Sequence, residues 1–110
     1  MSDAEIRKMY GGRRSKSWTL MDGVALNREH PTTFEIPTWD ERVSQNVGAS
    51  VKLGFVPDEK DLPSERMWVK VAQRIGGRYI GTLDNDPVCL GANPGDPIEF
   101  GPENILSIWE

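Results

Sequence analysis

Two runs of residues on either side of the glycine pair Gly76-Gly77 alternate between apolar and polar positions. Residues 67–72 read MWVKVA, and residues 78–83 read RYIGTL after the glycines. A period of two indicates β-strands with one buried face, and adjacent glycines supply the positive φ that tight hairpin loops need. This hairpin constrains the fold more than any other feature, because it predicts a chain built around an antiparallel sheet.

The register of this hairpin depends on the length of its loop. A two-residue loop would place Val71 opposite Thr82. A three-residue loop over 76–78 would place Val71 opposite Leu83 and Lys70 opposite Asp84. The second register joins apolar with apolar and positive with negative, so we predict it.

Shorter elements surround the hairpin. Thr38 and Glu41 have the spacing of a capping box, which predicts a brief helix that ends before Gly48. Further strands are predicted at 32–36, 51–55, 98–100 and 105–109, with a strand pair around Asp22-Gly23 and a 3₁₀ turn at 102–104. Short strands between Gly and Pro turns predict a mainly β fold, and the single 3₁₀ turn before the last strand favours a small SH3-like barrel. Closure of that barrel would leave no strand edge exposed.

The 110 residues fit one domain, which we predict over 18–110, after a basic and flexible arm over 1–17 with a helical turn near 4–9. No apolar run approaches the ~20 residues of a membrane span, so no membrane contact is expected. The N-terminal residues lack the apolar stretch of a secretory signal. The single cysteine, Cys89, excludes an internal disulfide framework, and the cytoplasm is the predicted compartment.

Charge is distributed unevenly along the chain. The whole chain has 13 basic and 17 acidic residues; residues 1–18 hold five basic and two acidic ones, which leaves eight basic and fifteen acidic over 19–110. An acidic body repels phosphate backbones and suits a basic protein partner. Nucleic acid could bind only through the arm, where Tyr10 and Trp18 are available for stacking. The sequence leaves the oligomeric state open.

Five segments carry a resemblance to known proteins: HPTTFEIP at 30–37, VKL at 51–53, ERMWVKV at 65–71, YIGTLDNDP at 79–87 and GDPIEFGPENI at 95–105. Through them the chain resembles an uncharacterised bacterial family of small domains of unknown function, which is itself similar to predicted immunity proteins of toxin systems. The resemblance implies a small β-rich fold without established catalysis, and a toxin as the partner.

The polar turn after the hairpin is the leading candidate site. Arg66 and Trp68 are expected beside Asp84, Asn85 and Asp86, and together they predict a partner-binding surface. The two aspartates could instead hold a hard cation, although Asp and Asn before Pro87 are typical of a plain turn. Among the other tryptophans, Trp39 and Trp109 are predicted in the core, whereas the burial of Trp18 and Trp68 is left open.

Catalytic chemistry finds little support in the sequence. The only histidine, His30, precedes a proline at a chain break, where an exposed or structural role is expected. Cys89 lies between Val88 and Leu90, which favours a small buried side chain over a nucleophile. Neither glycine pair has the pattern of a phosphate loop. We therefore expect a non-enzymatic binding protein with no cofactor and no metal. A hydrolase or a metal enzyme that uses His30, Asp84 and Asp86 is a weaker alternative.

Overall fold

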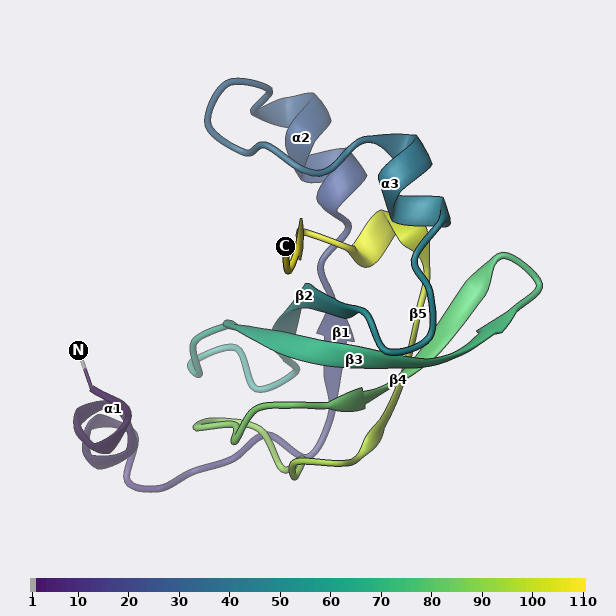
Figure 1. Cartoon of the computed structure of the whole chain (residues 1–110). Coiled ribbons are helices and arrows are strands. Elements are labelled where there is room, and N and C mark those ends of the chain that lie inside the picture. The colour runs from purple at the N-terminus through teal and green to yellow at the C-terminus, as the bar shows by residue number, and fades with distance from the viewer. Residues whose placement is uncertain (1) are drawn as a thin grey trace.

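A computed structural model describes residues 2–110 of the chain (Figure 1). It contains three short α-helices, six strands and one 3₁₀ turn. In chain order these are α1 (Asp3–Met9), β1 (Trp18–Leu20), α2 (Gly23–Glu29), α3 (Trp39–Val43), β2 (Ser50–Pro57), β3 (Glu65–Ile75), β4 (Arg78–Leu83), β5 (Pro97–Phe100), η1 (Pro102–Asn104) and β6 (Ser107–Ile108). None of the helices in residues 2–110 has the length and apolar character needed to cross a membrane.

The strands form one curled antiparallel sheet in the order β1-β2-β3-β4-β5. β6 pairs with residues 51 and 52 of β2, while β1 pairs with residues 55–57 of the same strand. The mainly β class is therefore confirmed, but the predicted closure is wrong: within residues 2–110 no ladder joins β5 to β1 or β6, and the sheet is a half-barrel. The free edge at β5 is four residues long and begins with Pro97, which limits edge-to-edge pairing.

The concave side of the sheet holds the core. Alternate residues of β2 and β3 are 0–4% exposed, and residues from β4, β5 and the segments after them complete the packing. The cluster contains Val51, Leu53, Phe55, Met67, Val69, Val71, Tyr79, Leu83, Leu90, Ala92, Ile98, Phe100 and Ile105. Trp18 packs against this core from β1, with its ring 6.3 Å from that of Phe55, and is half-buried.

The β3–β4 hairpin has a different register from the predicted one. Ile75 lies opposite Arg78, so the loop is the glycine pair alone, and both glycines have positive φ (54° and 81°). A shift between Val71 and Gln73 then moves the ladder by one residue. As a result Leu83 faces Val69, not Val71. The two glycines meet the backbone geometry of a tight hairpin turn. The bulge then shifts the register so that the apolar residues of both strands lie on the buried face.

Three of the predicted strands are wrong or shorter. Of the strand pair expected around Asp22-Gly23, the first strand forms as β1, but helix α2 replaces the second: the Asp22 carboxylate caps this helix by accepting the Ala25 amide at 3.0 Å. Residues 32–36 are turn and coil, because Asn27 holds this segment against α2 by donating to the Phe34 carbonyl at 2.7 Å. The closing strand covers only Ser107–Ile108. An Asp-Gly pair occurs both at helix N-termini and in hairpin turns, so the local sequence did not distinguish a helix from a strand pair.

The brief helix at α3 is confirmed, including its capping box between Thr38 and Glu41. The prediction that Trp39 lies in the core is wrong, since 62% of this residue is exposed. Arg42 takes the inward position one turn later, at 6% exposure, and donates to the carbonyls of Pro37 and Pro102. Its guanidinium lies 5.7 Å from the Trp39 ring centroid.

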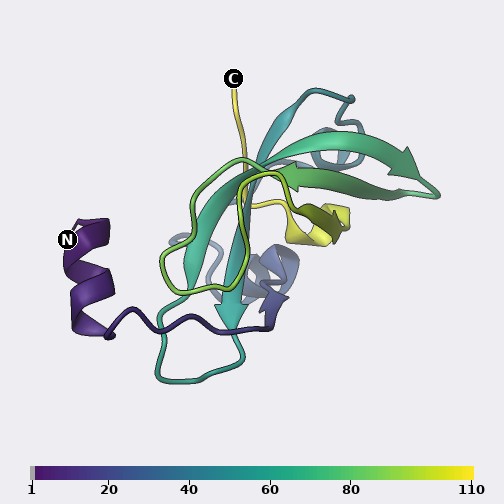
Figure 2. The same cartoon turned by 90° about the horizontal axis from the view of Figure 1, so that it is seen from below.

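The N-terminal arm contains α1, which confirms the helical turn predicted near 4–9. Figure 2 shows α1 beside the sheet, at the end of an extended segment. Ser15 is 1% exposed; its amide donates to the Cys89 carbonyl, and its own carbonyl accepts the Gly91 amide. Arg13 pairs with Asp61, and this hydrogen bond lowers the pKa of Asp61. The flexibility of the arm stays a prediction.

Candidate functional site

The convex face of the sheet carries an aromatic pair, in which Trp68 is half-buried and Trp109 is exposed. Trp68 of β3 meets Trp109 edge to face, with ring centroids 5.5 Å apart. Lys52, directly opposite Trp68 on β2, places its ammonium 4.7 Å from the Trp68 centroid. Asp84 and Ser50 join the two tryptophans around a cavity of 220 Å³. This candidate site contains Trp68 and Asp84, two of the predicted partner-binding residues, whose binding role stays a prediction. It also contains Trp109, and the prediction that Trp109 lies in the core is wrong.

Trp109 faces solvent because of the short last strand. Ile108 takes the core side of β6, so the next side chain falls on the opposite face. The Trp109 amide donates to the Ser50 carbonyl at 3.0 Å, which holds the residue against β2. At 69% exposure Trp109 is the most exposed large apolar residue among those described.

Asn85 holds the polar turn to β3. The Trp68 amide donates to the Asn85 side-chain oxygen at 2.5 Å, while the Asp84 amide donates to the Trp68 carbonyl at 2.9 Å. These two hydrogen bonds continue the β3–β4 pairing beyond Leu83, the last residue of β4. Asn85 therefore positions Asp84 beside the indole of Trp68, a role that the sequence pattern alone did not reveal.

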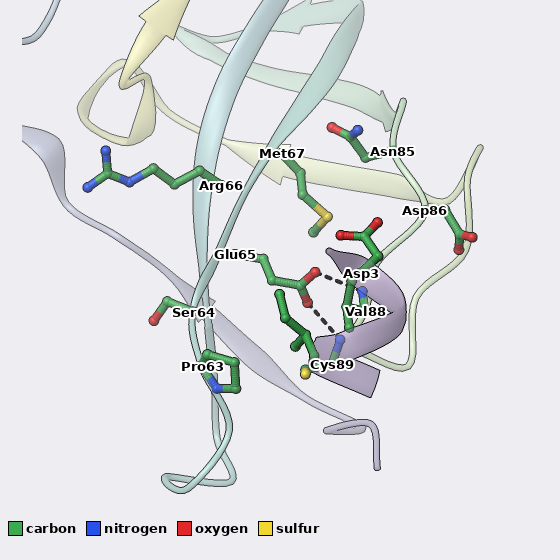
Figure 3. A pocket seen from close by; sticks show the side chains of 11 residues that line it. Asp3, Pro63, Ser64, Glu65, Arg66, Met67, Asn85, Asp86, Val88 and Cys89 are labelled. Atoms are coloured by element: carbon green, nitrogen blue, oxygen red, sulfur yellow. Dashed lines mark hydrogen bonds between the residues drawn. The ribbon is translucent and has the colours of Figure 1, made fainter. Parts of the chain in front are cut away.

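The other two predicted site residues do not line this small cavity. Arg66 lies over the ring of Phe34, 5.2 Å from its centroid, and Figure 3 shows its side chain directed away from Glu65. Asp86 faces α1 and pairs with Arg7 at 3.4 Å. The predicted residues are thus divided between two cavities: Trp68 and Asp84 line the small one, and Arg66, Asn85 and Asp86 line a second one.

A second cavity, of 260 Å³, lies between α1 and the polar turn (Figure 3). At its wall the Glu65 carboxylate accepts the amides of Val88 and Cys89, at 2.7 and 2.9 Å. Cys89 is 1% exposed, and its burial raises the pKa of its thiol, with Glu65 adding to the rise. The Glu65 carboxylate therefore holds the loop at Val88 and Cys89. The Cys89 thiol is buried and stays protonated.

A third cavity, of 360 Å³, has an acidic lining. It contains Glu35, Glu41 and Glu110, and the rest of the lining is Ile36, Pro37, Leu106, Ser107 and Ile108. Hydrogen bonds from the Thr38 amide, and then from its hydroxyl, lower the pKa of Glu41. Within residues 2–110, no ion pair neutralises any of the three glutamates. We call this feature the acidic cavity.

The residues considered for catalysis are separated. His30 ends α2 and is exposed, whereas Cys89 packs under α1, and these helices lie apart in both views (Figures 1 and 2). Over residues 2–110, no group of three histidine, cysteine, aspartate or glutamate side chains is arranged to hold a metal ion.

Comparisons with known proteins return no match: no family model, no curated protein and no solved structure matches the chain.

Proposed function

We propose that the chain is a non-enzymatic binding protein that recognises a basic protein partner, as an immunity-like protein occludes a basic toxin. In this proposal the half-barrel is an SH3-like scaffold, and the protein works in the cytoplasm. The observation that carries the proposal is the acidic cavity, because three glutamates share one opening without a lysine or arginine in its lining.

The acidic cavity suits a cationic side chain from a partner. Its apolar wall, from Ile36, Leu106 and Ile108, can cover the stem of an arginine or lysine while the glutamates meet the charged end. Carboxylates on the surface also accelerate the encounter with a positively charged protein.

The proposal is tested with a fluorescein-labelled deca-arginine peptide and fluorescence anisotropy at several salt concentrations. The double variant Glu35→Gln/Glu110→Gln should weaken binding by roughly fivefold to tenfold, the scale expected for losing two exposed charge contacts. Binding by the unmodified protein should fall as salt rises.

The matched control is the double variant Asp3→Asn/Asp86→Asn. It likewise removes two negative charges, but from the lining of the second cavity beside α1. It should bind the peptide nearly as the unmodified protein does. Equal weakening by both double variants would mean that only the net charge attracts the peptide, and the acidic cavity would lose its assigned role.

A further inference from the structure

The convex face of β3 alternates cationic and aromatic side chains. Met67, Val69 and Val71 point into the core at 4%, 0% and 2% exposure, so the residues between and before them point outward. These are Arg66, Trp68 and Lys70, and the ladder places Lys52 directly across from Trp68. We call Lys52, Arg66, Trp68 and Lys70 the basic face.

In the described part of the chain the cations of the basic face form no ion pair, although Arg66 shares a cavity lining with Asp3, Glu65 and Asp86. Across residues 2–110, the ion pairs involve Arg7, Arg13, His30 and Arg78, and none involves Lys52, Arg66 or Lys70. Arg66 and Lys70 are exposed, and Lys52 is half-buried over the Trp68 ring. Arg66 and Lys70 therefore carry exposed charges on either side of Trp68, and Lys52 lies across from Trp68 on the neighbouring strand.

Aromatic rings lie among these cations. Trp109 meets Trp68 and is mostly exposed, and Phe34 lies under Arg66 at the other end of the row. Cations that follow a backbone, interleaved with rings on which bases stack, are the arrangement that binds single-stranded nucleic acids without sequence preference.

We propose that the basic face binds single-stranded nucleic acid, with phosphates at Lys52, Arg66 and Lys70 and a base stacked on Trp109. Charge complementarity selects a polyanion, and the exposed ring of Trp109 favours one that carries aromatic bases over an acidic peptide. This location differs from the N-terminal arm, where Arg7 and Arg13 are already paired with Asp86 and Asp61. The proposal does not depend on the basic protein partner.

Asp84 gives the proposal a distinctive test. Its carboxylate lines the small cavity with Trp68 and Trp109, where it repels a phosphate. Asp84→Asn keeps the shape of the side chain and the backbone bond to Trp68, so the fold should be retained. It should tighten nucleic-acid binding by roughly twofold to fivefold, whereas a site for a cation would bind more weakly after this change.

The experiment measures fluorescence anisotropy of labelled dT10 and rU10 at low ionic strength with the full chain. The triple variant Lys52→Gln/Arg66→Gln/Lys70→Gln should abolish binding, and each single variant should reduce the slope of log affinity against log salt by about 0.7. Trp109→Ala should weaken binding by roughly fivefold to hundredfold.

The control variant is Arg14→Gln/Lys16→Gln, which removes two unpaired charges from the arm. It should retain nearly full binding, and circular dichroism should show the native spectrum for every variant. Equal loss in the arm variant would overturn the proposal in favour of the arm. Binding of a deca-glutamate peptide in preference to both oligonucleotides, weaker binding by Asp84→Asn, or no oligonucleotide binding by the unmodified chain would also overturn it.

Discussion

Single residues decide how closely neighbouring strands approach. Gly81 lies opposite Val71 on the core side of the hairpin, where a Cβ would stand 2.5 Å from a Val69 methyl and 2.6 Å from the Lys70 carbonyl oxygen. The first neighbour is a packed core side chain and the second is backbone, so neither can move away cheaply. The glycine within YIGTL is therefore required by packing and not by a turn.

Gly81→Ala should destabilise the protein by about 1–3 kcal/mol, because the added methyl group overpacks the core. Urea denaturation followed by tryptophan fluorescence measures this. Thr82→Ala, one residue further on and facing outward, is the control and should cost about 1 kcal/mol or less. An unchanged midpoint for Gly81→Ala would contradict the close strand packing.

Among the elements, α1 has the smallest contact with the rest of the fold. Its Ile6, together with Tyr10 after the helix, packs on a minor cluster of Leu62, Val88 and Cys89 that is separate from the main core. No residue of α1 is buried. The helix therefore covers the cysteine with little apolar area, and its detachment should require much less free energy than global unfolding.

The rate at which the Cys89 thiol reacts measures how well α1 covers it. In the native protein the thiol should react with a disulfide reagent at least ~100-fold more slowly than in urea, because it is buried and its pKa is raised. Ile6→Ala should speed the native reaction at least ~tenfold while the urea midpoint stays nearly unchanged. A fast reaction in the unmodified protein would instead indicate the mobile arm that composition predicts.

On the scale of the whole molecule, an open half-barrel replaces a closed barrel. The radius of gyration of the Cα atoms is 14.1 Å, compared with about 13 Å expected for a compact domain of this length. The arm and the tip of the β3–β4 hairpin project from the rest of the molecule in both views (Figures 1 and 2).

Small-angle scattering should therefore show a smaller radius of gyration, closer to ~13 Å, after deletion of residues 1–14. The deletion stops before Ser15, which is packed against the loop at Cys89, so the sheet should remain folded. The far-ultraviolet spectrum of the truncated chain provides the control. An unchanged radius would show that the arm folds back on the sheet in solution.

Local patterns in the sequence determined several features of this protein. Alternation predicted β2, β3 and β4, and the spacing of Thr38 and Glu41 predicted α3. Adjacent glycines predicted where the hairpin turns, but not its two-residue loop. Each depends on residues close together in the chain, whose geometry follows from backbone and side-chain preferences alone.

Other features were decided only by the tertiary structure. The bulge after Val71, the exposure of Trp39 and Trp109, and the separation of an acidic cavity from a basic face all depend on which distant segments meet. Net charge predicted an acidic body, yet alternation on β3 gathers cations on one convex surface. Composition sums charges along the chain, whereas a ligand meets only those that folding brings to the same face.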